Sequence, residues 1–328
     1  MSNDTRGAFL LASVLAACAG AIPSASGAAE AFPQRAIRLI VPYPPGGAGD
    51  IIGRILAARL GEAVHQQVVA DNRPGGGQVI ATQLTARANP DGYTLLLAST
   101  THAINPGLLK KLPYDSIRDF SAITLVADSP LLFLAHPALG VASIQELVAA
   151  AKSRPGRINY ASSGPGTGGH LSVELLKRMT GIDLVHIPYK GAGPALVDLV
   201  SGQVQVMCTS PLPSLPHVRS GRLKGLAMTG RVRSSAAPEI PTVAESGVPG
   251  YESTLWYALL APAATPQPVL RRLHAETVKA IKLPEVVEQI SALGAQTIGS
   301  SPQEAVKFLQ SEIARWTKLI EQASIRAD

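Results

Sequence analysis

The stretch at residues 37–50, IRLIVPYPPGGAGD, decides the fold, because an apolar run of strand length enters a loop rich in proline and glycine. The same plan returns at residues 158–170, INYASSGPGTGGH. Each stretch continues through a predicted helix and a short apolar strand into a second glycine loop, at residues 73–77 and 189–193. This duplication predicts two βαβ units with glycine loops at the carboxyl ends of parallel strands, where open α/β sheets bind ligands.

Glycine loops that open helices can bind anions without a cationic side chain. The first turn of a helix leaves backbone N–H groups without partners at the positive end of the helix dipole, and glycine lets a ligand come close to them. Each hydrogen bond to a charged group contributes ~1.5–3 kcal/mol, so several of them give roughly micromolar binding. Such loops can also serve only to turn the chain tightly. Four of them in matched positions favour a site between two lobes that close on a small molecule.

Residues 1–29 have the pattern of a secretory signal peptide. Arg6 precedes an apolar run at residues 8–19, and a small-residue cleavage site follows. The mature protein is therefore expected to be exported. A lipid anchor is the alternative, because the four residues that end at Cys18, LAAC, resemble a bacterial lipobox.

The composition is typical of a folded globular protein and excludes several classes. Of 328 residues, 46% are hydrophobic and 16% are charged. Removal of the signal peptide leaves Cys208 as the one cysteine, so neither an internal disulfide nor a cysteine metal cluster is expected. The net charge of +6 is spread without a Lys/Arg run and aromatic residues make up 4%, so nucleic acid is not an expected partner. No cofactor is predicted, and beyond the signal peptide no apolar run reaches the ~18 residues that span a bilayer.

The order of predicted strands and helices indicates an α/β protein of two lobes, each a mostly parallel sheet flanked by helices. A buried strand follows Asp128, where the chain is expected to cross to the second lobe, and an apolar run at residues 254–260 is expected to bring it back. The first lobe is therefore predicted to comprise residues 30–127 and 255–328, and the second lobe residues 128–254.

Two capping boxes predict where helices begin. Ser143 is followed three residues later by Glu146, and Ser301 by Glu304, so each serine and glutamate can satisfy each other's backbone N–H.

Two enzymatic alternatives compete with simple binding. The run GPGTGG at residues 164–169 matches the G-x-G-x-x-G dinucleotide fingerprint, but the next predicted strand ends without the acidic residue that would bind a ribose. An exported hydrolase acting on a small carboxylic ester or amide is the other alternative, since Ser162, Ser163, His102 and His170 supply suitable residue types. No G-x-S-x-G elbow surrounds either serine.

An ordered series of motifs resembles the Bug family of periplasmic solute-binding proteins, the receptors of tripartite tricarboxylate transporters. The resemblance covers nearly the whole mature chain. Its motifs are IVPYPPGG at residues 40–47 with Asp50, NRPGGG at 72–77, NPDGYTL at 89–95, YASSG at 160–164, IPYKG at 187–191 and PTVAE at 241–245.

The resemblance implies a type II periplasmic binding protein, the Venus-flytrap fold, that holds a small organic carboxylate by backbone amides and bridging waters. It also implies delivery of the ligand to membrane permease subunits, without catalysis, by what we expect to be a monomer. Carried over position by position, the ligand-binding residues would be Tyr43, Gly46, Gly47, Ala48, Asp50, Ser99, Thr100, His102, Ser162, Ser163, Thr167 and His170, with Tyr189 and Cys208 opposite.

In one place the sequence departs from the family pattern. Relatives often read Gln-Val-Asp where this chain has Gln203-Val204-Gln205. If that position faces the ligand, the missing acid disfavours amino-bearing compounds and favours a plain carboxylate, aromatic or dicarboxylic.

Overall fold

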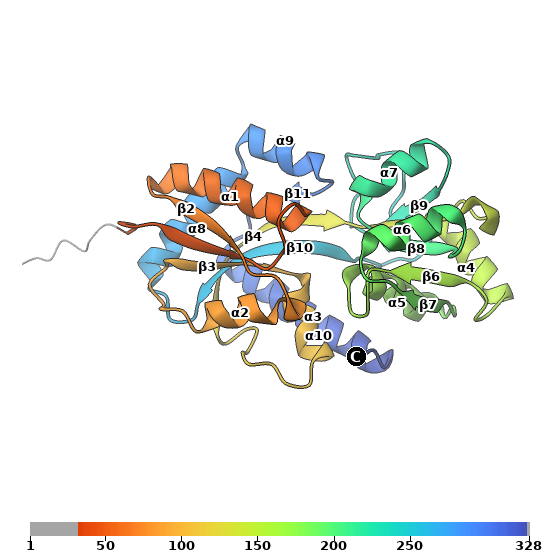
Figure 1. Ribbon diagram of the computed structural model, residues 1–328, viewed down its shortest axis with the longest axis horizontal. Helices are drawn as coiled ribbons and strands as arrows, with labels where there is room; N and C mark the ends of the chain where they lie inside the picture. The colour runs from red at the N-terminus through yellow and green to blue at the C-terminus, as the bar shows by residue number, and fades with distance from the viewer. Residues whose placement is uncertain (1–31, 327–328) are drawn as a thin grey trace, which may run out of the picture.

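The computed structural model describes residues 32–326 as two β-sheets, each covered by helices, that lie end to end along the long axis of the molecule (Figure 1). We call each sheet with its helices a lobe. The predicted signal peptide, with Cys18, lies outside the described residues. No helix among the described residues has the length and apolar character needed to cross a bilayer.

The first lobe has a six-stranded sheet with helices on both faces. Its strands are β1 (Ile37–Val41), β2 (Val68–Asn72), β3 (Thr94–Ser99), β4 (Phe120–Pro130), β10 (Thr254–Pro262) and β11 (Gln296–Thr297), in the order β11-β4-β10-β3-β1-β2. Its helices are α1 (Ala48–Val64), α2 (Val79–Ala86), α3 (Thr100–Leu108), α8 (Gln267–Ile281), α9 (Pro284–Ala292) and α10 (Pro302–Gln322).

The second lobe has a five-stranded sheet. Its strands are β5 (Leu132–Ala135), β6 (Asn159–Ser162), β7 (Val185–Pro188), β8 (Val206–Thr209) and β9 (Lys224–Met228), in the order β7-β6-β8-β5-β9. Its helices are α4 (Ile144–Ser153), α5 (Gly168–Thr180), α6 (Ala192–Ser201) and α7 (Pro211–Arg219).

Two neighbouring connections join the lobes. β4 ends at Pro130 and β5 begins at Leu132, so the chain changes sheets within a few residues. The return is made at the start of β10, where Thr254 pairs with Pro130, and Figure 1 shows β4 and β10 running together toward the second lobe. The boundaries expected from the sequence, at residues 128 and 255, fall within these two strands.

The strand directions follow from these crossings. β1 is parallel to β2 and β3, and both β3 and β4 are antiparallel to β10, so β1 to β4 run the same way. In the second sheet β6, β7 and β8 are parallel, and β5 is antiparallel to β8 and β9. The strand that follows each crossing is thus reversed, as is the short β11, which is antiparallel to β4. The prediction of a two-lobed α/β fold is confirmed; both sheets are mixed, since most of their strands run the same way but the reversed strands pair antiparallel with their neighbours.

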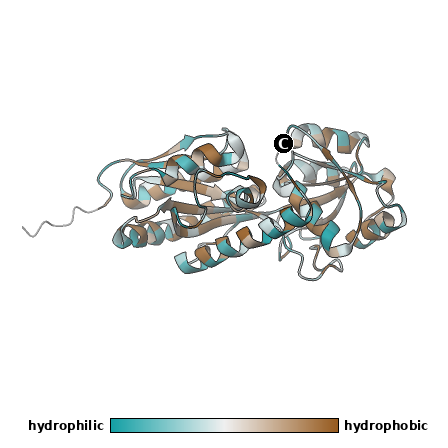
Figure 2. Ribbon diagram, turned by 90° about the horizontal axis from the view of Figure 1, so that it is seen from below, coloured by the Kyte–Doolittle hydropathy of each residue, from teal (hydrophilic) through white to brown (hydrophobic). Residues whose placement is uncertain are grey.

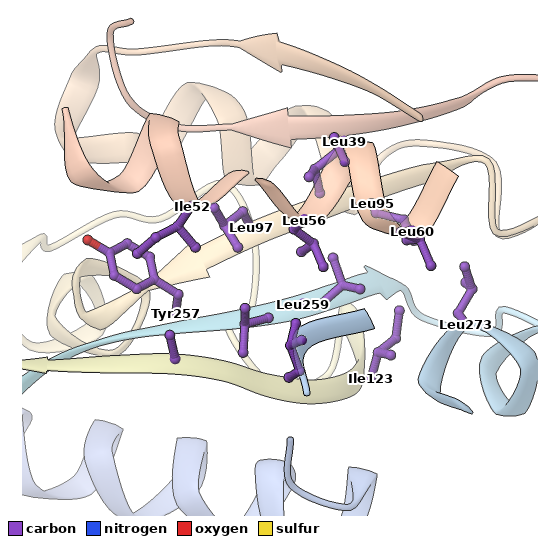
Figure 3. Packing of buried hydrophobic residues seen from close by; sticks show 14 of the residues in the cluster. Leu39, Ile52, Leu56, Leu60, Leu95, Leu97, Ile123, Tyr257, Leu259 and Leu273 are labelled. Atoms are coloured by element: carbon purple, nitrogen blue, oxygen red, sulfur yellow. The ribbon is translucent and has the colours of Figure 1, made fainter. Parts of the chain in front are cut away.

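Alternate residues of each strand pack on opposite faces of the sheet. Leu39 of β1 faces α1 and α8, whereas Ile40 faces α2, α3 and α10. Figure 3 shows Ile52, Leu56 and Leu60 of α1 directed at the strands, and burial of each such side chain contributes ~1.5–3 kcal/mol. Figure 2 shows the same division across the molecule, with hydrophobic residues on the inner strands and hydrophilic residues on outer helix surfaces. The strand ends that carry the loops are therefore fixed by packed cores in both lobes.

Candidate functional site

The carboxyl ends of six strands meet beside the two crossing connections. In the first sheet Ser99, the last residue of β3, lies opposite Tyr257, close to the start of β10. In the second sheet Thr209, the last residue of β8, lies opposite Leu132, the first residue of β5. Parallel neighbours end at the same edge of a sheet. The loops after β1, β2 and β3 and the loops after β6, β7 and β8 therefore all open at the junction between the lobes.

Asp50 holds the loop after β1 in shape. Gly46 has a φ of +93° and donates its N–H to the Asp50 carboxylate over 2.9 Å. From the end of β2, Asn72 Nδ2 donates to the same carboxylate (2.7 Å) and to the carbonyl of Tyr43 (2.9 Å). Burial would raise the pKa of Asp50, but hydrogen bonds from Arg54, Gly46 and Asn72 lower it. The carboxylate of Asp50 thus joins the loop after β1 to the end of β2.

The N-terminus of α1 is open next to this loop. Gly47 is the N-cap residue and makes no side-chain cap. A Cβ at Gly46 or Gly47 would meet no atom within 4 Å. The N–H groups that a helix leaves without partners are those of its N-cap residue and first turn, here Gly47, Ala48 and Gly49. These groups can receive an anion without any rearrangement of a capping side chain.

Other helices at the junction share this property. The N-caps of α1, α2, α3, α5, α6 and α7, which follow the six strand ends, make no side-chain cap hydrogen bond. Helices α4 and α10, which begin elsewhere, are capped by the hydroxyls of Ser143 and Ser301. The proline-started helices α8 and α9 also lack a side-chain cap. Uncapped N-termini are therefore gathered at the junction, though they are not confined to it.

A polar cluster links the first-lobe loops. Ser99 Oγ donates to Gln78 Oε1 over 2.8 Å, and the ring of Tyr43 meets that of Tyr257 edge-on at 6.2 Å. Burial raises the pKa of Tyr43, while hydrogen bonds to Ser99, Gln78 and Tyr257 act against it. Gln78 has a left-handed φ of +69° and follows three glycines of positive φ, a conformation that costs a non-glycine residue about 1–3 kcal/mol. Neither Gln78 nor Tyr257 was predicted from the sequence; the glycine run that precedes Gln78 was the one signal that pointed to it.

The loop after β6 is shaped by a second set of hydrogen bonds. Ser162 Oγ accepts the N–H of Gly164 (3.1 Å), and Thr167 Oγ1 donates to the carbonyl of Gly164 (2.8 Å). The N–H of Gly166 donates to Nδ1 of His170 over 2.9 Å. Ser162 and His170 are buried, whereas Thr167 at the N-terminus of α5 is partly exposed. The structure thus brings these sequence-predicted residues together around one loop.

Two more predicted residues adjoin this loop. Ser163 follows β6 and is half-buried. The N–H of Tyr189 donates to the carbonyl of Ser162 (3.0 Å), and its hydroxyl donates to Asp198 (2.7 Å), which raises the pKa of Tyr189 to about 12. The loop also approaches the first lobe, since a Cβ on Gly166 would lie 2.5 Å from the side chain of Leu108.

Three predicted residues have side chains in the packed interior, and the structure does not bring those side chains to the loops. Thr100 Oγ1 accepts the N–H of Trp256 (2.9 Å). The ring of His102 is buried, with Nε2 2.8 Å from the carbonyl of Ser116, and burial lowers its pKa to about 4. Cys208 lies in the core of the second lobe, where burial raises the pKa of its thiol. Helix and strand periodicity turn these side chains inward.

The expectation that Gln205 could face the ligand is wrong. Gln205 precedes β8, and it is the other end of β8, at Thr209, that reaches the junction. Its side chain accepts the N–H of Asn159 at the start of β6 (3.0 Å). The departure from the family pattern at this position therefore carries no information about ligand choice.

The arrangement favours binding over hydrolysis. Ser162 Oγ lies 2.6 Å from Nε2 of His186, but Ser162 is fully buried and its hydroxyl is shared with the N–H and carbonyl of Gly164. A nucleophile needs an oxygen that a substrate can reach. Among residues 32–326 no group of three His, Cys, Asp or Glu side chains could hold a metal ion. A cavity of about 560 Å³ lies elsewhere on the second lobe, lined by Lys224 and Arg233, and includes none of the predicted residues.

Comparisons with known proteins agree with this geometry. The family described as "Tripartite tricarboxylate transporter family receptor" matches residues 52–325. The chain is similar to Protein BugT of Bordetella pertussis, with 37% identity over 300 residues that cover 91% of this chain and 92% of BugT.

Solved structures of similar proteins contain dicarboxylates. Rpa4515 of R. palustris, solved with adipate, has 35% sequence identity and a TM-score of 0.78, covering 90% of this chain and 100% of that chain. MatC of Rhodopseudomonas palustris, with bound malate, has 31% identity and a TM-score of 0.73, covering 88% and 100% respectively.

Proposed function

Because this chain belongs to the tripartite tricarboxylate transporter receptor family, which includes the Bug proteins, we propose that it captures a small dicarboxylate between its lobes. It is a solute-binding receptor by family. The substrate class rests on adipate and malate in the two similar structures. The observation that carries the proposal is the gathering of uncapped helix N-termini at the junction, because backbone N–H groups there can neutralise carboxylates at both ends of one molecule.

We also propose which residues of the two lobes contact the ligand. In the first lobe the backbone of Gly46, Gly47 and Ala48 would bind one carboxylate, with Tyr43 and Ser99 beside it. In the second lobe Ser163 and the N-terminal turn of α5 would bind the other, with Thr167 and Tyr189 at its edge. Asp50 would act by holding the first loop, since its carboxylate already accepts hydrogen bonds from Gly46 and Asn72.

The receptor would pass its ligand to membrane permease subunits and perform no chemistry. Family members include a periplasmic binding protein, BugD, and an exported monomer released by cleavage after residue 29 fits that role. Mass spectrometry of the mature N-terminus tests export: a chain that starts near Glu30 supports cleavage, and an acylated Cys18 would replace it with a lipid anchor.

A thermal-shift panel tests the binding function. Purified protein is heated with adipate, malate, benzoate and an amino acid, each over a range of concentrations. A ligand at 100 times its Kd stabilises the folded state by ~2.7 kcal/mol, which raises Tm by several degrees. Saturable shifts with the dicarboxylates and recovery of unaltered ligand support the proposal. Turnover of an ester or amide substrate would instead favour the hydrolase, and no shift with any carboxylate would contradict the assigned ligand class.

A further inference from the structure

Three aromatic side chains form a stack beneath the loop after β6 in the second lobe. His170 of α5 and His186 of β7 lie face to face, with ring centroids 3.9 Å apart and planes 9° apart. Tyr160 of β6 stacks on His186 at 4.9 Å. The stack therefore ties the helix that follows the loop to the two strands beside it.

Both histidines also bond to the loop itself. His170 Nδ1 accepts the N–H of Gly166 over 2.9 Å. His186 Nε2 lies 2.6 Å from Ser162 Oγ, and that hydroxyl binds both the N–H and the carbonyl of Gly164, each at 3.1 Å. The ring of His170 thus fixes the end of the loop, and the ring of His186 fixes its beginning. Ser163, between these two points, makes no hydrogen bond to either histidine.

The histidines can do this because they are neutral. Burial, the nearby His186 and Lys177 lower the pKa of His170 to about 3, and burial lowers that of His186 although Glu174 acts against it. A protonated Nδ1 on His170 would face the Gly166 N–H as a second donor, and the bond would be lost. The charged neighbours are already engaged: Glu174 accepts hydrogen bonds from Tyr160 (2.6 Å) and Lys177 (2.7 Å).

We infer that His170 and His186 are positioning residues, which set the conformation of residues 162–168 for carboxylate binding without touching the ligand. This inference rests on the proposed function. His170 is buried behind the loop and Nδ1 is occupied by the loop's own N–H. Ordering the loop before binding removes an entropic cost from the binding step, so loss of either bond weakens binding more than it weakens the fold.

Substitutions at His170 separate a positioning role from a structural one. His170→Leu keeps the buried volume but removes the acceptor, whereas the amide oxygen of His170→Gln can still accept the Gly166 N–H. Leu176→Ala is the control, because Leu176 is a buried core residue further along the same helix.

Amide hydrogen exchange of the ligand-free protein is measured on the peptide that covers residues 162–168. We expect exchange there to be at least tenfold faster in His170→Leu, close to wild type in His170→Gln, and unchanged in Leu176→Ala despite a lower Tm. Equal exchange in wild type and His170→Leu, or equal acceleration in Leu176→Ala, would overturn the inference.

Adipate titration then connects the loop to binding. The Kd for adipate is expected to rise at least tenfold in His170→Leu and to be restored in His170→Gln. A Kd that is unchanged in His170→Leu would overturn the positioning role. If wild-type protein binds no carboxylate in the thermal-shift panel, the proposed function fails, and the hydrogen-exchange result still decides whether the histidines hold the loop.

Discussion

Gly47 leaves the N-terminus of α1 open, and a side chain there should block it. Its φ of −84° and ψ of 165° suit any residue, and a Cβ would meet no atom within 4 Å. Gly47→Val should therefore fold, with Tm lowered by no more than a few degrees. Its methyl groups would occupy the space that a carboxylate needs beside the Ala48 N–H, so the Kd for adipate should rise at least tenfold, about 1.4 kcal/mol. Isothermal titration calorimetry measures this change.

The smaller substitution provides the control for that experiment. Gly47→Ala adds one carbon and should weaken binding less than valine does. The Kd for adipate should therefore rise in the order glycine, alanine, valine while the fold stays the same. Normal affinity in Gly47→Val would mean that the loop after β1 only turns the chain.

The residues that sequence reasoning could place are those whose role is local. Gly46 and Gly164 mark turns after strands, and the structure has φ of +93° and +134° there. Cys208 and His102 stand just as close to strand ends, but the direction of a side chain depends on packing that no short motif encodes. Gln78 and Tyr257 join Tyr43 through contacts between segments far apart in sequence, so no spacing in the sequence connects them to Tyr43.

The helices that begin at the junction have no side-chain cap, whereas α4 and α10, which begin elsewhere, are capped by serine. The predicted capping box of α10 is confirmed: Glu304 N–H donates to Ser301 Oγ, and Ser301 N–H donates to the Glu304 carboxylate. At Ser143 half of the predicted box forms: the serine accepts the Glu146 N–H over 3.2 Å, but the Glu146 carboxylate accepts the N–H of Ala142 instead of that of Ser143. Both serines could be predicted because a cap is a contact across three residues.

Loss of a supporting cap should change stability and leave binding alone. Ser301→Ala removes the acceptor for the Glu304 N–H and should lower the free energy of unfolding by about 1 kcal/mol. Urea denaturation measures this loss, and calorimetry should give an unchanged Kd for adipate. Weaker binding in Ser301→Ala at temperatures where the protein is fully folded would show that α10 takes part in the site.

A buried acid on one of the crossing strands makes the stability of the molecule depend on pH. Burial and the charge of Glu252 raise the pKa of Asp128, on β4 near the crossing, from 3.8 to about 6. A carboxyl with a raised pKa favours the folded state fully below 3.8, and this contribution is lost as the pH rises through 6. Asp128→Asn cannot ionise, so it should be more stable than wild type by up to about 3 kcal/mol at pH 7.5 and nearly equal to it near pH 4. Urea denaturation at the two pH values checks this, and a constant difference between them would contradict the buried-acid explanation.

Closure follows if the ligand contacts are divided between the lobes. A ligand that touches loops of both lobes binds the closed state better, and only such a difference in affinity can shift the population. The lobes are linked by the two neighbouring crossings, and Leu171 of α5 belongs to the same buried cluster as Trp316 and Ile320 of α10. Movement should therefore be a rotation about this side of the junction. Small-angle scattering should show a smaller radius of gyration with saturating adipate in wild type and a weaker response in Gly47→Val at the same concentration. An unchanged radius in wild type at saturation would mean that the two sets of loops do not grip one molecule, and that capture occurs on a single lobe.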